Sequence, residues 1–316
     1  MSAASTTASP RILVVRLGAF GDIIHALPAV ATLKRSFPSS RVTWVVEPRW
    51  TPLLEGNPHI DNIVLLRRKT AGGLLQTWRD LRAESYDPAI DFQGLMKSAL
   101  TAAVARPHRL IGFSDTRERA AAWFYTQRVS ATAAHVVDRN LELAAAAGAP
   151  NRIHEFLLPP GSPEGELPTG DFVLASPLAG WASKQWPAEY YAELAARLDI
   201  PLVLNVPAAN AISVPGATLH VSGLPGLIHA TRRATAVIGV DSGPMHLADA
   251  LGKPGVALFG PTDPARNGPY NRSLRVLRSP SAITTYKRNR ADGSMRRISP
   301  TEVLEALRAA LRCPVK

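Results

Sequence analysis

Short apolar segments alternate with longer amphipathic segments along almost the whole chain. Residues 11–16 form the first apolar segment, which is typical of a buried parallel strand. A glycine turn follows, and from Asp22 onward apolar residues recur at helical spacing, which predicts a helix with Asp22 at its N-cap. A strand, a turn and a helix in this order are the unit from which parallel α/β folds are built.

The same alternation predicts two α/β domains. In the first half, the predicted strands span residues 41–46, 62–66, 88–91 and 109–112, and the predicted helices span 73–84, 96–104, 117–125 and 135–147. In the second half, the predicted strands span 172–175, 201–205, 236–240 and 255–259, and the predicted helices span 187–198, 224–233, 300–311 and a segment that begins near Gly243.

The composition of the connecting segments gives the expected domain boundaries. Residues 158–170 are rich in proline and glycine, as is typical of a linker. We therefore expect a disordered tail at residues 1–10, an N-terminal domain at 11–157 and a C-terminal domain at 171–316. The last helix, 300–311, is expected to pack back on the N-terminal domain. The tail has no basic region followed by an apolar one, so a secretory signal is not expected.

The overall composition is that of a globular protein of two domains. The chain has 316 residues, of which 46% are hydrophobic and 19% charged. Cys313 is the single cysteine, which excludes an intrachain disulfide and favours a reducing compartment. No segment approaches the roughly 18 consecutive apolar residues that a membrane span requires. We expect a cytoplasmic protein.

The charge balance is strongly basic. The chain has 36 Lys and Arg against 25 Asp and Glu, a formal net charge of +11. This charge favours polyanionic partners such as nucleic acid, anionic lipid or a phosphorylated glycolipid, although a well-solvated basic surface explains it equally well. No recognised nucleic-acid-binding motif occurs, so nucleic acid is not expected as a partner.

The first candidate site follows the first predicted strand. Gly18 and Gly21 allow a tight turn, and Asp22 follows at the carboxyl edge of the predicted sheet, where open α/β folds bind ligands. The carboxylate occupies the position where a dinucleotide's pyrophosphate would lie, so a phosphate cradle is not predicted here. Asp22 is either a chemically active group or a helix cap.

The second candidate site lies in the C-terminal half. After the strand that ends at Val240, a helix begins with free N–H groups of Ser242, Gly243 and Met245, which suit a diphosphate. Lys184 follows another strand and is placed to neutralise phosphate, and the loop at 259–264 is placed to close around a bound ligand. The alternative for Lys184 is a solvated loop lysine. The alternative for the nearby His246 is a packed or surface side chain.

Five segments together resemble one known family. Residues 11–28, 90–98, 184–187, 240–247 and 259–263 are similar, in order and over nearly the whole chain, to the ADP-heptose:lipopolysaccharide heptosyltransferases of glycosyltransferase family 9. The resemblance implies a GT-B fold, with two Rossmann-like domains whose parallel sheets face a central cleft. It also implies an inverting transfer of heptose from ADP-heptose to a Kdo-lipid A or inner-core lipopolysaccharide acceptor.

The resemblance also implies roles for individual residues. Asp22 matches the family's proposed general base. The donor-binding positions are Lys184, Asp241, Ser242, Gly243, His246 and Thr262. The acceptor-binding positions are Gly21, Arg67, Arg68, Gln93, Lys97 and Arg117. No cofactor and no metal are expected.

Two segments depart from the family's pattern. Residues 178–181 lack the hydroxyl side chains that usually precede the lysine, and residues 205–210 lack an acidic residue that is thought to hold the nucleotide's ribose. We therefore keep two alternatives: a related GT-B transferase with another nucleotide sugar or surface-glycan acceptor, and a non-catalytic nucleotide- or nucleic-acid-binding protein. Because a lipid A acceptor lies in a membrane, residues 286–290 and 296–297 are candidates for peripheral contact with the cytoplasmic face of the inner membrane.

Overall fold

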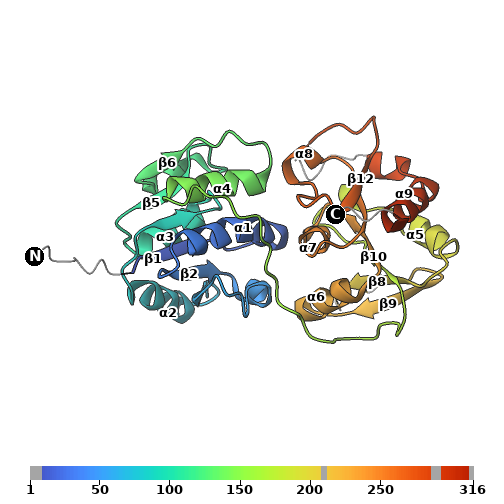
Figure 1. Cartoon of the computed structure of the whole chain (residues 1–316), viewed down its shortest axis with the longest axis horizontal. Helices are drawn as coiled ribbons and strands as arrows, with labels where there is room; N and C mark the ends of the chain where they lie inside the picture. Colours follow the sequence, from blue (N-terminus) through green and yellow to red (C-terminus); the bar gives the residue numbers. More distant parts are fainter. Residues whose placement is uncertain (1–8, 208–211, 286–292, 313–316) are drawn as a thin grey trace, which may run out of the picture. The chain divides into compact units, whose positions relative to one another are not determined.

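The computed structural model describes residues 9–207, 212–285 and 293–312. The chain divides into two compact units, Met1–Leu157 and Leu158–Lys316 (Figure 1). Each unit contains one sheet of six strands in which every neighbouring pair is parallel. The predicted α/β class with two parallel sheets is thereby confirmed.

The first sheet has the strand order β3-β2-β1-β4-β5-β6. Its strands are β1 (Arg11–Val15), β2 (Arg41–Val46), β3 (Asn62–Leu65), β4 (Ala89–Asp91), β5 (Leu110–Phe113) and β6 (Gln127–Val129). Chain order therefore reverses between β1 and β4, and in open α/β sheets ligands bind at the carboxyl ends of the strands beside such a reversal.

Helices cover both faces of this sheet. They are α1 (Phe20–Ser36), α2 (Ala71–Arg82), α3 (Met96–Val104), α4 (Val136–Ala146) and the 3₁₀ helices η1 (Pro48–Leu53) and η2 (Arg119–Phe124). Helices α1 and α4 pack together on one face (Figure 1). Side chains of α2, α3 and η2 share one buried cluster with Leu13 and Val15 of β1 on the other face.

The second sheet repeats the same topology, with the order β12-β11-β10-β7-β8-β9. Its strands are β7 (Val173–Ser176), β8 (Leu202–Val206), β9 (Ala217–Val221), β10 (Ala236–Val240), β11 (Gly255–Phe259) and β12 (Leu274–Arg278). Its helices are α5 (Ala188–Ala195), α6 (Leu224–Arg233), α7 (Gly243–Ala250), α8 (Pro264–Asn267), α9 (Pro300–Arg312), η3 (Ala182–Lys184) and η5 (Ser294–Arg297). Here the chain order reverses between β7 and β10.

The strands that the sequence pattern does not predict are all edge strands. β6, β9 and β12 lie at the ends of their sheets and have several half-exposed or exposed residues. The central strands β1, β7 and β10 are buried at nearly every position, so they appear as continuous apolar runs. The helix predicted at 117–125 is the 3₁₀ helix η2.

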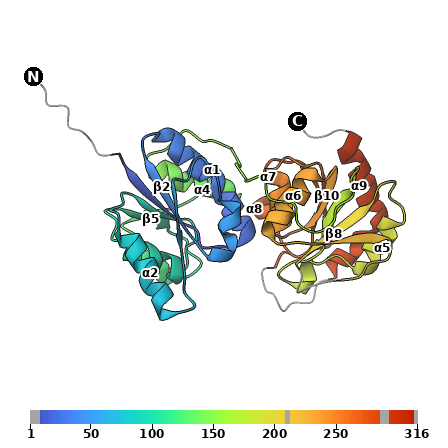
Figure 2. The same cartoon turned by 90° about the horizontal axis from the view of Figure 1, so that it is seen from below.

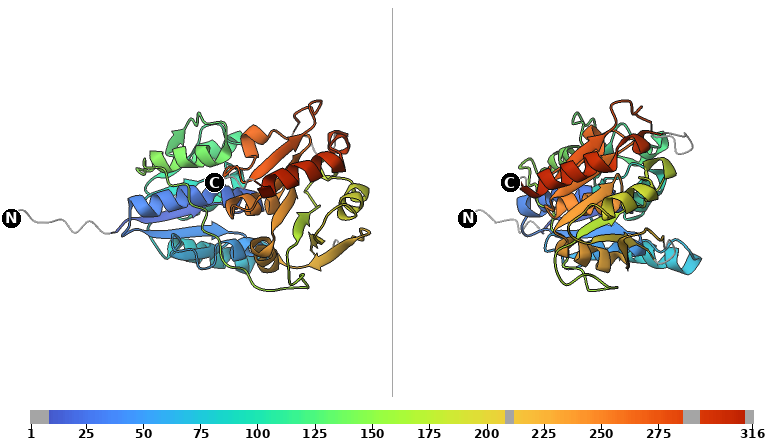
Figure 3. Two further views of the ribbon diagram at one scale, coloured as in Figure 1. Left: turned by 45° about the vertical axis from the view of Figure 1, so that its right-hand side comes forward. Right: turned by 90° about the vertical axis from the view of Figure 1, so that its right-hand side faces the viewer.

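The last helix, α9, packs on the core of the second unit. Its packing against the first unit stays a prediction. Val303, Leu304 and Leu307 of α9 belong to the core of the second unit, and α9 packs on β11, β12 and α5 (Figures 2 and 3). The strong amphipathic pattern of 300–311 predicts one buried face, but the pattern carries no information about which sheet that face covers.

Helix α9 begins with a complete capping box. The Glu302 carboxylate accepts a hydrogen bond from the Ser299 N–H at 2.7 Å, and Ser299 Oγ accepts one from the Glu302 N–H at 3.2 Å. Hydrogen bonds from the Ser299 N–H and hydroxyl lower the pKa of Glu302 below its ordinary value of 4.5. Pro300 occupies the first helical position, where a missing N–H leaves no partner unsatisfied.

We expect Ser299→Ala to lower the free energy of unfolding by about 1 kcal/mol at neutral pH. Because the folded-state pKa of Glu302 is lowered, the part of this stabilisation that comes from its carboxylate is complete above pH 4.5 and is lost as the pH falls through the lowered value. Urea unfolding at neutral and acidic pH measures both values. Glu305→Gln, on the exposed face of the same helix, is the control. An effect of Ser299→Ala that stays constant down to acidic pH would contradict this account.

Candidate active site

Asp22 lies in the first turn of α1, directly after β1. The helix begins at Phe20 with Ala19 as its N-cap, so the prediction that Asp22 is the N-cap residue is wrong. Asp22 is instead the third helical residue, and its Oδ2 accepts a hydrogen bond from the Ala19 N–H at 3.3 Å. The side chain retains 37% of its exposure, so it is both part of the capping arrangement and accessible at the sheet's edge.

Arg16 holds the Asp22 carboxylate. An Arg16 guanidinium nitrogen lies 2.5 Å from Asp22 Oδ2, and the same guanidinium donates to the carbonyl oxygen of Phe92 after β4. Arg16 itself is buried. Arg16 is not among the predicted site residues, although a basic residue that ends a predicted strand beside a candidate carboxylate is a usable signal.

Gln93 joins the loops that follow β1 and β4. Its side-chain Oε1 accepts a hydrogen bond from the Leu17 N–H at 2.9 Å. The Leu17 carbonyl oxygen in turn accepts from the Glu47 N–H at 3.1 Å. The backbone of Leu17 therefore connects the ends of the three strands β1, β2 and β4.

Asp91 fixes the loop that carries Gln93. Its carboxylate is fully buried and accepts hydrogen bonds from Ser98 Oγ at 2.8 Å, from the Tyr125 hydroxyl at 2.7 Å and from the backbone N–H groups of Gln93 and Gly94. Burial raises the pKa of Asp91, and these hydrogen bonds oppose the rise. Burial and the adjacent Asp91 raise the pKa of Tyr125. Asp91 therefore has a structural role: it holds the loop that follows β4 in place.

Glu47 brings two of the predicted acceptor residues together. Its carboxylate lies 3.2 Å from Arg68 Nε, 3.5 Å from Lys97 Nζ and 3.2 Å from an Arg49 guanidinium nitrogen, and it is only 7% exposed. Sequence reasoning missed Glu47 as well. The signal was an acidic residue directly after a predicted strand.

The remaining predicted acceptor residues are not joined to this cluster. Arg67 is exposed and forms an ion pair with Asp80 at 3.5 Å. Arg117 is exposed in the segment that follows β5, where its backbone lies beside Gly94. Gly21 is the second residue of α1. All of them nevertheless follow the carboxyl ends of strands of the same sheet.

In the second unit, four of the predicted donor residues meet at one carboxylate. Asp241 follows β10 and is only 5% exposed. Its Oδ2 lies 2.6 Å from Lys184 Nζ and accepts a hydrogen bond from Thr262 Oγ1 at 2.6 Å. His246 Nε2 lies 3.8 Å from Oδ1. The ends of β7, β10 and β11 are thus connected through one buried group.

Helix α7 begins beside this cluster, with Ser242 as its N-cap. Met245 N–H donates to the Ser242 carbonyl oxygen at 3.1 Å, so the prediction of a free N–H group there is wrong. The N–H groups of Ser242 and Gly243 have no acceptor within the part of the chain that the structure describes. The buried Ser242 hydroxyl also lacks a partner among those residues. These donors suit an anion.

The loop that carries Lys184 is held by Trp186. The indole N–H donates to the Ile298 carbonyl oxygen at 2.9 Å, and the ring packs edge-on against Tyr191 with 4.8 Å between ring centroids. The Lys184 ammonium group lies 4.5 Å from the centroid of the Trp181 ring, a cation–π distance. Trp186 therefore positions the loop, while Lys184 carries its charge.

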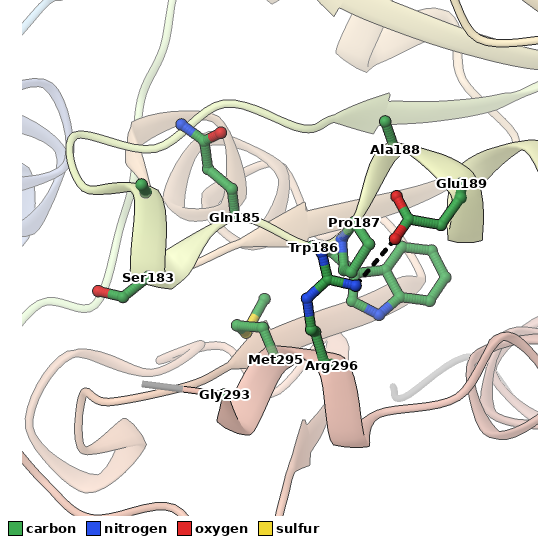
Figure 4. Close-up of a pocket in the computed structure, with 10 residues that line it drawn as sticks. Ser183, Gln185, Trp186, Pro187, Ala188, Glu189, Gly293, Met295 and Arg296 are labelled. Atoms are coloured by element: carbon green, nitrogen blue, oxygen red, sulfur yellow. Dashed lines mark hydrogen bonds and ion pairs between the residues drawn. The ribbon is translucent and has the colours of Figure 1, made fainter. Parts of the chain in front are cut away.

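A cavity of about 310 Å³ lies beside this loop, between the segment that leads into α5 and the helix η5. Gln185, Trp186, Glu189 and Arg296 contribute to its lining (Figure 4). Glu189 and Arg296 form an ion pair at 2.9 Å across it. Arg296, a predicted membrane-contact residue, is therefore paired, and residues 286–290 lie outside the described residues.

The two segments that depart from the family's pattern differ in how far the structure describes them. Asn205 is buried and donates to Ser222 Oγ at 2.7 Å and to the His220 carbonyl oxygen at 3.2 Å, which ties β8 to β9. Residues 208–211 lie outside the described residues.

Within the described part of the chain, no group of three or more His, Cys, Asp or Glu is arranged to hold a metal ion. No helix described there is long and apolar enough to cross a membrane.

The fold has solved counterparts among sugar transferases. The solved structure of E. coli heptosyltransferase WaaC with ADP-2-deoxy-2-fluoro heptose superposes with a TM-score of 0.74 at 25% identity, covering 93% of this chain and 98% of that one. The two parallel α/β units therefore have the GT-B fold of these solved transferases. The model of glycosyltransferase family 9 (heptosyltransferase) matches residues 74–200 and 221–294. The chain belongs to this family.

Curated relatives cover most of the chain. Lipopolysaccharide heptosyltransferase 1 of Pseudomonas aeruginosa is 30% identical over an alignment of 291 positions that covers 83% of this chain and 82% of that protein. Lipopolysaccharide heptosyltransferase 2 of Escherichia coli is 29% identical over an alignment of 349 positions, gaps included, that covers 95% of this chain and 98% of that protein. Membership of an enzyme family contradicts the alternative that the chain is a non-catalytic binding protein.

The pairing of Lys184 with Asp241 predicts a coupling in stability. We expect Lys184→Met to lower the free energy of unfolding by about 3 kcal/mol, because it leaves a buried carboxylate without its counter-charge. The double variant Lys184→Met/Asp241→Asn should be destabilised by at least about 1 kcal/mol less than the sum of the single changes. Urea unfolding of the four proteins measures this difference.

The matched control is the exposed pair Arg308–Asp199, at 3.7 Å in the same unit, for which we expect no measurable coupling. Additive effects of the Lys184 and Asp241 changes would show that their contact contributes nothing.

Proposed function

We propose that the protein transfers heptose from ADP-heptose to a Kdo-lipid A or inner-core lipopolysaccharide acceptor, with inversion at the anomeric carbon and Asp22 as general base. Family membership and the names of the relatives support this proposal. The observation that carries it is the pair of polar clusters, each beside the reversal of strand order in its sheet. Such positions are where open α/β sheets bind their ligands.

Asp22 is suited to activate the acceptor. In the proposed step, an acceptor hydroxyl oxygen attacks the anomeric carbon while the carboxylate takes the hydroxyl's proton. The bond between the anomeric carbon and the diphosphate oxygen breaks, and ADP leaves with the electron pair. Arg16 and the Ala19 N–H hold Oδ2, which fixes the carboxylate's direction.

The residues around Asp241 are suited to hold the donor. Lys184 and the N–H groups of Ser242 and Gly243 would neutralise the diphosphate and the charge that develops on it as ADP leaves. Asp241 holds Lys184, and Thr262 in turn donates a hydrogen bond to the Asp241 carboxylate. The imidazole of His246 lies near the same carboxylate. No step in this sequence requires a metal ion.

The basic residues at the edge of the first sheet suit an anionic acceptor. Arg68 and Lys97 meet at Glu47, with Gln93 connected to the same loops through Leu17. Arg67, Arg117 and the backbone of Gly21 complete the proposed acceptor surface. Carboxylates of Kdo and phosphates of lipid A would be bound by such guanidinium and ammonium groups. We propose a cytoplasmic location with peripheral contact to the inner membrane, because such an acceptor is held in lipid.

We expect Asp22→Asn to lower kcat by about 10²- to 10⁴-fold, since asparagine keeps an oxygen for the Ala19 N–H but takes up no proton. The measurement is ADP release from ADP-heptose with a truncated Kdo acceptor, together with thermal unfolding to show that α1 is intact. Asp138→Asn is the matched control, because Asp138 also lies in the first turn of a helix of this unit. Undiminished turnover by Asp22→Asn would contradict the role of general base and leave Asp22 with a helix-capping role alone.

A donor panel tests the nucleotide sugar separately. With the same acceptor, we expect kcat/KM for ADP-heptose to exceed the values for UDP and GDP sugars by about a hundredfold or more, as expected of a site that hydrogen-bonds its substrate. The absence of hydroxyl side chains at 178–181 and of an acidic residue at 205–210 favours the alternative of a different donor. Faster turnover of a UDP or GDP sugar would establish that alternative.

A further inference from the structure

Helices α2 and α3 border an apolar groove in the first unit, on the opposite side of its sheet from α1 and α4 (Figures 1 and 2). The groove has a volume of about 510 Å³, and its lining includes Leu66, Leu74, Thr77, Trp78, Leu100 and Val104. Leu74, Leu75 and Trp78 on α2 and Leu100 on α3 are between 43% and 52% exposed. Large apolar side chains gathered at one exposed place mark an interaction surface.

The exposed side chains of α2 are not needed to attach this helix to the domain. Leu81 is buried in the core, and Thr77 is buried with its hydroxyl donating to the Leu65 carbonyl oxygen at 2.9 Å. Leu74, Leu75 and Trp78 lie outside this attachment, so α2 has a second apolar face. That face remains uncovered within the described part of the unit.

Basic residues precede α2 and lie on the same helix as this second face. Residues 67–82 contain five basic side chains and one acidic one. The acidic one, Asp80, is engaged by Arg67 at 3.5 Å and by Gln76 at 2.7 Å. The Arg82 guanidinium lies 5.0 Å from the centroid of the Trp78 ring. Exposed apolar groups within a basic rim are complementary to an apolar layer bounded by negative charge.

We propose that this surface, formed by Leu74, Leu75, Trp78 and Leu100 with its rim of Arg79 and Arg82, docks on an anionic phospholipid bilayer. The apolar side chains enter the boundary between head groups and acyl chains, and the guanidinium groups contact lipid phosphates. Tryptophan is well suited to this boundary because its ring is apolar and its N–H is polar.

The charge of the rim argues against a second copy of the chain as the occupant. A two-fold contact through this surface would bring the same basic residues of both copies face to face. An anionic bilayer instead supplies the opposite charge at the depth where the rim lies.

Docking through this surface would bring the proposed acceptor residues near the bilayer. Arg68 lies just before α2 and Lys97 lies in the first turn of α3, and both contact Glu47 at the carboxyl edge of the sheet. A glycolipid's sugars would then reach this edge while its acyl chains stay in the bilayer. This consequence rests on the proposed function, whereas docking itself does not.

Sedimentation of the full chain with vesicles tests the docking. We expect binding to phosphatidylcholine vesicles that contain phosphatidylglycerol, and weaker binding without the anionic lipid or at high salt. Leu75→Gln/Trp78→Gln should weaken binding by about tenfold or more, and Arg79→Gln/Arg82→Gln should weaken it and reduce its salt dependence. Leu311→Gln on α9, which is 39% exposed, is the matched control and should bind like the unchanged protein.

Two outcomes overturn the proposal. One is equal vesicle binding by Leu75→Gln/Trp78→Gln. The other is absence of vesicle binding together with a dimer, detected by sedimentation equilibrium, that this double variant abolishes. Because these vesicles contain neither donor nor acceptor, failure of the proposed enzymatic function leaves the result unaffected.

Turnover separates docking from catalysis. With an acceptor analogue that lacks acyl chains, ADP release by Leu75→Gln/Trp78→Gln should match that of the unchanged protein. With the acceptor embedded in anionic vesicles, the KM of the double variant for the acceptor should exceed that of the unchanged protein. An unchanged KM for the embedded acceptor would contradict a role of this surface in reaching the substrate.

Discussion

Both units depend on one constraint: a central strand must pair in parallel with a neighbouring strand on each of its two sides. β1 pairs with β2 and β4, and β7 pairs with β8 and β10. Because the chain leaves such a strand on one face and returns on the other, the loops separate at the carboxyl ends and leave room for a ligand. Asp22 and Lys184 follow these central strands, and Gln93 and Asp241 follow their neighbours β4 and β10.

Charge compensation determines what the carboxylates at these positions do. Asp22 is held by Arg16, Glu47 by Arg68 and Lys97, and Asp241 by Lys184, so each retains a nearby cation. Asp91 instead has neutral donors and is fully buried, and its pKa is raised by burial. The same side chain thus serves as a fixed internal tie in one place and as an accessible charged group in another, according to its partners and exposure.

Much of the fold was predictable because the central strands are buried on both faces and therefore form continuous apolar runs. The edge strands β6, β9 and β12 were missed because half of their residues meet solvent. The order of strands and helices also predicts which side chains reach the sheet's edge. It does not predict their partners when these are distant in sequence, as with Lys97 and Glu47. Arg16 lies close to Asp22 in the sequence, so its pairing could have been predicted. The error at Asp22 has a local cause: an aspartate at the N-cap and one at the third helical position both accept a backbone N–H.

The hydrogen bond from Trp186 to Ile298 has a consequence for the order in which the protein matures. The two residues are 112 positions apart, and the bond holds the loop of Lys184 against the segment that leads into α9. During synthesis, the strands of the second sheet emerge from the ribosome before Ile298 does. All six strands of this sheet precede Ile298, so the loop of Lys184 receives its anchor only after the whole sheet has been synthesised.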